Sequence, residues 1–369
     1  MSTQEEAQKN WDSYCIAEIT KIQSILNIHH IILDDMQPHI KGERYLMQAV
    51  TTTSGRKLIL LGRDENNMRV VVKATCDTSG KKELTHERHC REILKKMDFA
   101  GAVFHTPAEV AFIEQAGYTI SITAFIEQES TFIERPLNKQ FNLALRAFKA
   151  QESAHATTFK HRKLIESVFE IRDAETYLKN FLTFKDNITY ALPEEHTMHA
   201  LLSDVFKGLN EHKVYIEQYS GFLTHTDFVP HNIRVKDDTI YLLDHSSLTF
   251  GNKYEGWARF LNFMTLYNPD LEQALIVYVR DNRTKEESIA LQMMRMYRLG
   301  EIIWYYVRTL DKSTENLLLL NTARIYFWTS VLSYISKGER VPIEVIRQYT
   351  ETRDKLRSED EKRRQQGLH

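Results

Sequence analysis

The sequence predicts an α+β protein of two parts, a small antiparallel sheet with one helix followed by a larger, mainly helical part. Between residues 44 and 125, short runs of β-forming residues alternate with turn residues and are interrupted once by a helical pattern. From residue 137 onward, apolar residues recur mostly at helical spacing. The chain has 369 residues, 42% of them hydrophobic, which is enough for two parts with real cores.

The small part is expected to begin with an amphipathic helix over residues 3–26. Its apolar face would carry Trp11, Ile16, Ile19, Ile22 and Leu26. Strands are expected at residues 45–50, 57–61, 69–74, 108–113 and 118–125, with a helix at 82–97 between the third and the fourth. Turn residues at 52–55, 64–67 and 115–117 separate neighbouring strands, so a mostly antiparallel sheet should form.

The larger part is expected to be helical with a single β insert. Helices are predicted at residues 137–156, 164–181, 198–219, 271–281, 286–310, 316–336 and 343–364. Residues 232–235 and 239–243 form the insert, a hairpin around the turn 236–238. We place the boundary after residue 126, which gives units 1–126 and 127–369, and expect a ligand between them.

Charge and cysteine content exclude several classes of protein. The net charge is −2, which gives no bulk attraction for nucleic acid or anionic membranes. Cys15, Cys76 and Cys90 lie far apart, which argues against disulfides or a zinc site and fits a reducing compartment. The polar start and the absence of a long apolar run predict a cytoplasmic protein with no membrane partner.

Residues 222–247, FLTHTDFVPHNIRVKDDTIYLLDHSS, carry the chemistry. Asn232 opens the predicted hairpin and Asp244 closes it, so their side chains should converge, with Asp227 one loop earlier beside them. Mg²⁺ takes oxygen ligands and keeps several waters. Phosphoryl transfer needs that metal on the phosphates and a carboxylate that orients the attacking hydroxyl. One Asp and one Asn could hold the metal while the other Asp faces the acceptor.

The segment from His225 through Asp227 to Asn232 resembles the H-x-D-x-x-x-x-N catalytic loop of the aminoglycoside phosphotransferase and choline kinase-like families. These families are relatives of protein kinases. The resemblance implies a protein-kinase-like two-lobed fold and an ATP- and Mg²⁺-dependent kinase that acts on a small hydroxylated molecule. It also implies that Asp227 is the catalytic base, that Asn232 and Asp244 bind Mg²⁺, and that His225 braces the loop.

A kinase-like small lobe also needs a lysine on its third strand and a glutamate on the next helix to hold it. Lys73 ends the apolar run Val70-Val71-Val72, and Glu87 shares the inward helix face of Cys90 and Leu94. Glu83, one turn earlier, is the alternative partner. Ser54 and Gly55 either cover phosphate oxygens or form a plain hairpin turn. By position, the backbone at Phe125, Ile126 and Glu127 is expected to bind the adenine.

Some features depart from the family. Glu255 only loosely replaces an acidic residue that relatives carry at the start of the next helix, and His155 is expected to be structural. Asp244 is followed by His-Ser and by no Ala-Pro-Glu segment, which disfavours a protein kinase. An inactive kinase-fold nucleotide-binding or scaffold protein remains the other alternative.

The acceptor and the nucleotide stay open at this point. An aminoglycoside should require an acidic pocket, and choline an aromatic pocket with a carboxylate. Glu255, Glu301, Trp304 and Tyr305 are candidate walls for either pocket. The sequence does not distinguish ATP from GTP as the nucleotide, and it does not specify the oligomeric state.

Overall fold

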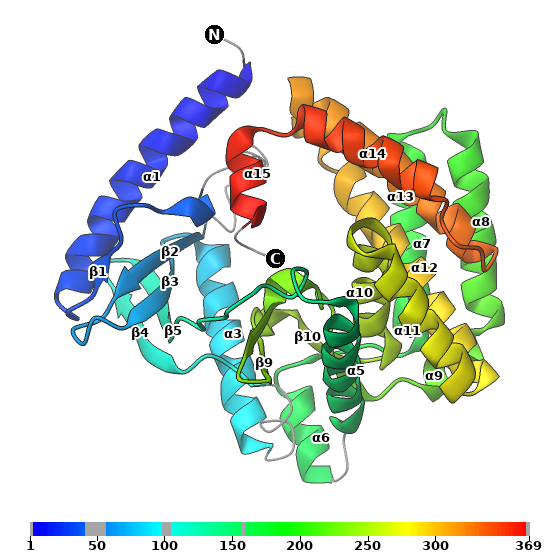
Figure 1. The fold of residues 1–369 in the computed structure, drawn as a ribbon, viewed down its shortest axis with the longest axis horizontal. Coiled ribbons are helices and arrows are strands. Elements are labelled where there is room, and N and C mark those ends of the chain that lie inside the picture. The colour runs from blue at the N-terminus through cyan, green and yellow to red at the C-terminus, as the bar shows by residue number, and fades with distance from the viewer. Residues whose placement is uncertain (1–2, 41–56, 98–104, 156–158, 367–369) are drawn as a thin grey trace.

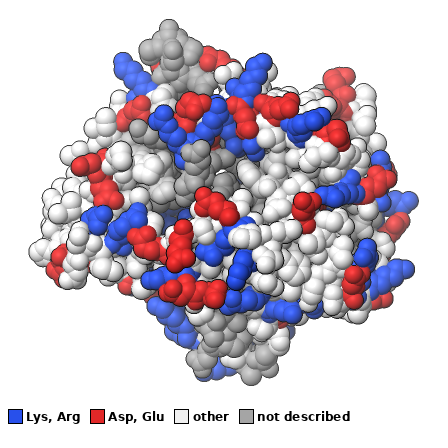
Figure 2. Space-filling view, in the orientation of Figure 1, with Lys and Arg blue, Asp and Glu red and all other residues white. Residues whose placement is uncertain are grey.

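The computed structural model describes residues 3–40, 57–97, 105–155 and 159–366 (Figure 1). The chain is α+β, as predicted, with a small antiparallel sheet on one side and a large helical part on the other (Figure 1). Among the described residues, no helix is long and apolar enough to cross a membrane. On the face shown in Figure 2, basic and acidic side chains are interspersed.

Among the described residues, the small sheet has five antiparallel strands in the order β1-β2-β3-β5-β4. They are β1 (Ile32–Leu33), β2 (Leu58–Arg63), β3 (Arg69–Thr75), β4 (Glu109–Gln115) and β5 (Tyr118–Ala124). Ala116 and Gly117 both have positive φ, 49° and 81°, which is the backbone of a tight type I′ hairpin turn. Four of the predicted strands are therefore confirmed, whereas the expected strand at 45–50 lies outside the described residues.

Two helices accompany this sheet. Trp11, Ile22 and Leu26 of α1 (Thr3–Asn27) are buried against the strands, but Ile16 is 69% exposed, so its predicted place in the core is wrong. Asp77 is the N-cap of helix α3 (Thr78–Lys96). Its carboxylate accepts hydrogen bonds from the backbone N–H groups of Ser79 and Gly80. Its inner face joins the core of the helical part rather than the core of the sheet.

The helical part contains eleven described helices, most of them at the predicted places. They are α5 (Leu137–Ser153), α6 (Phe159–Glu166), α7 (Ala174–Ala191), α8 (His196–Glu211), α9 (Lys213–Gln218), α10 (Tyr254–Tyr267), α11 (Pro269–Asn282), α12 (Lys285–Val307), α13 (Glu315–Ser336), α14 (Ile343–Leu356) and α15 (Glu359–Gln366).

Three predicted helices are interrupted. The predicted helix at 164–181 is wrong, because strand β6 (Glu170–Ile171) separates α6 from α7. The helix at 343–364 breaks at Arg357 and Ser358, and the helix at 198–219 breaks at His212. In the first and third of these cases the pieces on both sides of the break pack on the same core, so apolar periodicity alone hid the interruption, whereas α15 has no apolar residue and its separation from α14 had no periodic signal.

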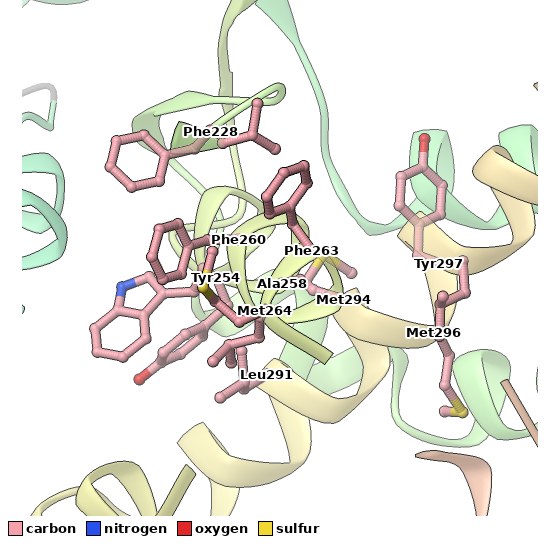
Figure 3. Packing of buried hydrophobic residues seen from close by; sticks show 14 of the residues in the cluster. Phe228, Tyr254, Ala258, Phe260, Phe263, Met264, Leu291, Met294, Met296 and Tyr297 are labelled. Carbon is pink, nitrogen blue, oxygen red and sulfur yellow. The ribbon is translucent and has the colours of Figure 1, made fainter. Parts of the chain in front are cut away.

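Helix α10 was not predicted, and it is the centre of the large core. Phe228, Tyr254, Ala258, Phe260 and Met264 crowd together around it (Figure 3). Nearly all of its residues are buried, so it lacks the polar face that makes a surface helix recognisable. It packs against α12 and against the strand that precedes Asp227.

Short strands place the chemically interesting residues. Strand β7 (Phe222–His225) pairs antiparallel with β10 (Leu248–Gly251), and β8 (Ile233–Lys236) pairs with β9 (Thr239–Leu242) around Asp237 and Asp238, which both have positive φ. The short helices η2 (Pro230–Asn232) and η3 (His245–Ser247) flank this hairpin. Asp227 therefore follows β7, Asn232 precedes β8, and Asp244 follows β9.

Candidate active site

The loop after β7 is tied to the segment after β9. His225 is buried, and its Nε2 donates to the carbonyl oxygen of Leu243 at 2.9 Å. The backbone N–H of Thr226 donates to the carbonyl of Ser247 at 2.8 Å. These two bonds hold the residues around Asp227 beside those around Asp244, which is the bracing geometry expected of His225.

Both oxygens of the Asp227 carboxylate accept hydrogen bonds. Oδ1 accepts from Nε of Arg259 at 2.9 Å, and Oδ2 accepts from the side-chain amide of Asn232 at 3.0 Å. Burial by itself raises the pKa of Asp227, but the charges of Arg259 and of His225 outweigh it and leave this pKa below its ordinary value. Asp227 is therefore a carboxylate near neutral pH.

Asp244 is held in an unusual backbone conformation, with φ at 56°, a region that Asp tolerates better than most residues. Ser246 donates its hydroxyl to Oδ1 at 2.6 Å and Ser247 donates to Oδ2 at 2.9 Å. Burial raises the pKa of Asp244, whereas the charge of Lys73 and the Ser246 hydroxyl lower it, and the pKa ends well below its ordinary value.

Lys73 on β3 reaches α3. Its Nζ lies 2.8 Å from both carboxylate oxygens of Glu87, and Arg91 lies 3.6 Å from the same carboxylate. Glu83, the alternative partner, pairs instead with Lys57. The structure thus brings Lys73 and Glu87 together. Glu87 lies one helical turn after Glu83 and is more deeply buried.

Two cavities meet at this set of residues. The sheet-side cavity, about 310 Å³, lies between β2, β3, α3 and residues 123–126, and Lys73 and Glu87 line it. The helix-side cavity, about 630 Å³, lies among α10, α12, α13, α14 and α15, and Asp227 lines it. His231, Asn232 and Asp244 line both. A ligand in each cavity would therefore meet the other at Asn232 and Asp244.

Two of the residues expected near an adenine line the sheet-side cavity. Phe125 and Ile126 line the sheet-side cavity, but Glu127 is not among the described residues that line it and pairs with Arg69 at 2.9 Å. The backbone N–H of Phe125 already donates to the carbonyl of Arg69 at 3.0 Å, so it is committed to the sheet. Ser54 and Gly55 lie outside the described residues.

Glu255 lies outside both cavities, as far as the described lining residues show. It is fully buried and accepts from Arg172 at 2.8 Å, from Tyr177 at 2.7 Å and from Arg298 at 3.3 Å. It therefore joins α10 to α7 and α12 and is not among the described residues that line the helix-side cavity. Of the other candidate walls, Glu301, Trp304 and Tyr305 do line the helix-side cavity.

Two arginines that act on Asp227 were not predicted from the sequence. Arg259, on α10, pairs with it directly, and the charge of Arg298, on α12, also lowers its pKa. Arg259 and Arg298 lie far along the chain from Asp227, in helices whose packing had to be known before either arginine could be placed near it.

Asn232 and Asp244 are chemically suited to a shared Mg²⁺. The amide group of Asn232 faces Asp227, which leaves the amide oxygen as an acceptor, and Asp244 is ionised. Among the described residues, no three His, Cys, Asp or Glu side chains cluster so as to hold a metal ion by themselves. Two oxygen ligands fit an ion that takes its remaining ligands from phosphates and water, as Mg²⁺ does.

Comparison with known proteins supports the fold. No protein-family model matches the chain, and no curated protein matches its sequence. Solved structures do match. Macrolide 2′-phosphotransferase type I is 10% identical with a TM-score of 0.53, over 84% of this chain and 97% of that one. The GDP complex of wild-type aminoglycoside 2′-phosphotransferase-IIIa is 12% identical with a TM-score of 0.54, over 76% and 92%.

A thermostable mutant of aminoglycoside phosphotransferase APH(4)-Ia, in a ternary complex with AMP-PNP and hygromycin B, is 14% identical with a TM-score of 0.52, over 78% and 91%. The chain therefore has the protein-kinase-like fold of the antibiotic phosphotransferases, which confirms the fold that the catalytic-loop resemblance implied. At these identities the likeness concerns the fold alone.

Proposed function

We propose that the protein is an ATP- and Mg²⁺-dependent phosphotransferase that moves the γ-phosphate to a hydroxyl group of a small molecule. The observation that carries the proposal is the meeting of two cavities at Asn232 and Asp244, with Lys73 on one side and Asp227 on the other. A nucleotide in the sheet-side cavity would direct its phosphates toward an acceptor in the helix-side cavity. The complex of APH(4)-Ia with AMP-PNP and hygromycin B supports this arrangement by analogy.

Each residue of the proposed site has a distinct task in this reaction. Lys73, oriented by Glu87, binds phosphate oxygens. Asn232 and Asp244 hold the Mg²⁺, which when bound neutralises charge that develops on the phosphates. Asp227 orients the acceptor hydroxyl and takes its proton. The lowered pKa of Asp227 makes it a weak base, which suits a loose transition state in which the proton leaves late.

A small acceptor is favoured over a protein substrate. Residues 245–253 contain η3 and β10 and lead directly into α10, so they leave no room for an extended activation segment after Asp244. The helix-side cavity has the volume usual for small-molecule sites.

The nucleotide site can be tested by thermal melting with ATP or GTP, with and without Mg²⁺. A ligand that binds only the folded protein stabilises it by about 2.7 kcal/mol at a hundred times its Kd. We expect a Mg²⁺-dependent rise in Tm that Asp244→Ala abolishes and that Asp204→Ala, an exposed change on α8, retains. No rise with either nucleotide at millimolar concentration would overturn the proposal.

Asp227→Asn separates an enzyme from an inactive nucleotide-binding protein. In an enzyme the variant should still bind Mg·ATP and lose most phosphate transfer, because Asp227 is assigned to the proton of the acceptor and not to the nucleotide. Undiminished turnover in Asp227→Asn would show that Asp227 is not the catalytic base.

A further inference from the structure

Arg259 is the one residue of α10 between Tyr254 and Thr265 that is not buried. A charged side chain on such a helix loses its hydration unless it reaches water or a partner. Arg259 reaches both, because it lines the helix-side cavity, keeps 20% of its side chain exposed and pairs with Asp227. The core helix therefore carries a cation to the wall of the proposed acceptor site.

Other arginines of the helical core are more fully engaged than Arg259. Arg295 and Arg298 of α12 are both buried, and each is held by more than one side chain. Their partners are Asn262, Thr265 and Glu272 for Arg295, and Glu255 and Glu301 for Arg298.

The guanidinium of Arg259 has a single hydrogen-bond partner among the described residues. That partner is Asp227, and the bond, 2.9 Å long, uses Nε alone. An arginine carries its N–H donors in a planar fork, so one edge can hold a carboxylate while the terminal nitrogens bind a second anion. The terminal nitrogens of Arg259 are therefore available to a ligand in the cavity.

Arg259, Asp227 and Asn232 form a hydrogen-bonded row. Oδ1 of Asp227 accepts from Arg259, and Oδ2 accepts from the side-chain amide of Asn232 at 3.0 Å. The guanidinium and one of the proposed Mg²⁺ ligands thus lie on the two oxygens of the same carboxylate. All three side chains line the helix-side cavity together with Asp244. A phosphoryl group bound near Asn232 and Asp244 would lie within reach of Arg259.

The cations near this row come from opposite sides. Lys73 lines the sheet-side cavity and is not among the described residues that line the helix-side cavity. Arg259 lines the helix-side cavity and is not among those that line the other. In a loose transition state, charge spreads over the three equatorial oxygens of the transferred group. A cation on each side would stabilise that charge better than one alone.

We propose that Arg259 is a catalytic residue: it orients Asp227 through Nε and binds the phosphoryl group in transit through its terminal nitrogens. This inference rests on the proposed phosphotransferase function. In the transfer, the bond between the γ-phosphorus and the β,γ-bridging oxygen breaks, and its electron pair stays on ADP. The acceptor oxygen bonds to the phosphorus, and its proton passes to Asp227. Arg259 exchanges no proton and contributes hydrogen bonds and charge.

Two ligands that represent different stages of the reaction test the inference. Mg·AMP-PNP represents the nucleotide before transfer. Mg·ADP with aluminium fluoride places a planar anion where the phosphoryl group moves. The Kd of each is measured by titration calorimetry with the full-length protein. We expect Arg259→Gln to weaken the aluminium fluoride complex about 100-fold and to change the Kd of Mg·AMP-PNP by less than about threefold, because the contact is made only in transit.

Three further variants assign the effect. Arg259→Lys keeps the charge but loses the fork, so it should weaken the aluminium fluoride complex about tenfold. In Asp227→Asn, adding Arg259→Gln should still weaken that complex, because Arg259 contacts the phosphoryl group itself. Arg280→Gln, an exposed change on α11, should change neither Kd. If Arg259→Gln does not melt as a folded protein, Arg259→Lys, which can keep the ion pair, decides the question.

The inference is overturned if the Arg259 variants weaken both complexes equally or weaken neither. It is also overturned if Arg259→Gln has no further effect in Asp227→Asn, since Arg259 would then act only through Asp227. A wild type that binds Mg·AMP-PNP but not the aluminium fluoride complex contradicts it as well. Failure of the proposed function is a different result, in which the wild type binds neither complex and no nucleotide raises its Tm.

Discussion

At the scale of single residues, the candidate site consists of carboxylates that are each held by a cation from another element. Asp227 is paired with Arg259 of α10, and Asp244 is close to Lys73 of β3. Glu87 is paired with Lys73 and Arg91. Because each partner comes from a different part of the fold, the charges of the site depend on the packing of the whole molecule.

The lowered pKa of Asp244 predicts how the free energy of unfolding changes at low pH. A carboxyl group whose pKa is lower in the folded state contributes stability above its unfolded pKa, about 3.9, and loses it as the pH falls below that value. The free energy of unfolding should therefore decrease as the pH is lowered below 4. This decrease should be less steep in the Asp244→Asn variant. Urea unfolding from pH 2.5 to 7 measures this. Asp204→Asn should keep the wild-type profile, and equal slopes for all three proteins would contradict the prediction.

Lys73 and Glu87 should be coupled in stability. Lys73→Met leaves a buried carboxylate with only the more distant Arg91, which should destabilise the nucleotide-free protein by about 1–3 kcal/mol. Adding Glu87→Gln removes that charge and should restore part of the loss. Urea unfolding of the wild type, both single variants and the double variant gives the coupling energy. Strictly additive losses would mean that the two side chains do not interact.

The same substitution should impair catalysis. If Lys73 binds phosphate oxygens in the transition state, Lys73→Met should lower kcat/KM for ATP about 100-fold. Steady-state kinetics with a hydroxylated acceptor measures the loss, and a loss smaller than threefold would remove Lys73 from the site.

Local rules explain which of these residues could be found from the sequence. Lys73 follows the apolar run Val70-Val71-Val72 within β3, and Glu87 shares a helix face with buried neighbours, so the pair was predicted from these two signals together with the kinase-like resemblance. Asn232 and Asp244 flank a hairpin, which fixes their proximity. Arg259 and Arg298 had no such local signal, because their relation to Asp227 depends on how α10 and α12 pack.

At the scale of elements, Gly256 sets the approach of α10 to strand β7. A Cβ at this position would lie 2.9 Å from Oε1 of Gln151 and 3.1 Å from the carbonyl oxygen of His225. The backbone N–H of Gly256 also donates to the hydroxyl of Thr224 at 3.2 Å. Since α10 also carries Arg259, any shift of this helix changes the environment of Asp227.

Gly256→Ala should therefore destabilise the protein by about 1–3 kcal/mol through overpacking and reduce turnover more than nucleotide affinity. Gly208→Ala on α8 is the matched control, because a Cβ there meets no atom within 4 Å and should stabilise the helix by about 0.5–1 kcal/mol. Thermal melting and steady-state kinetics measure both variants. A Gly256→Ala protein with wild-type stability and turnover would show that α10 need not approach β7 so closely.

The sequence predicted elements well where a local signal marks their ends. In the hairpins at residues 116–117 and 237–238, Gly117, Asp237 and Asp238 are turn residues that adopt positive φ more readily than most. Strand β1 is too short to be recognised, and α10 is buried on almost all sides, so neither has a periodic pattern. Such elements are stabilised by tertiary packing rather than by local preference.

At the scale of the whole molecule, the C-terminal helix links the two parts. Helix α15 lies between the sheet and the long helices (Figure 1), and it packs against η1 (Pro38–Ile40) beside the sheet. Its Glu361 is buried and lines the helix-side cavity but is not among the described residues that line the sheet-side cavity. A chain end far from the catalytic loop in sequence therefore forms a wall beside the proposed acceptor.

Removal of α15 should consequently open the proposed acceptor side to water. Because α15 also packs against η1, whose His39 lines the sheet-side cavity, nucleotide affinity has to be measured as well. A closed site protects the phosphoryl group from hydrolysis. A chain that ends at Ser358 should therefore hydrolyse ATP several-fold faster at saturating Mg·ATP in the absence of an acceptor, and its Kd for Mg·ATP sets that concentration. Asp360→Asn, an exposed change on α15, is the control and should behave as the wild type. Phosphate release and nucleotide titration measure the two quantities. Unchanged hydrolysis in a folded, truncated protein would show that α15 does not exclude water from the reaction.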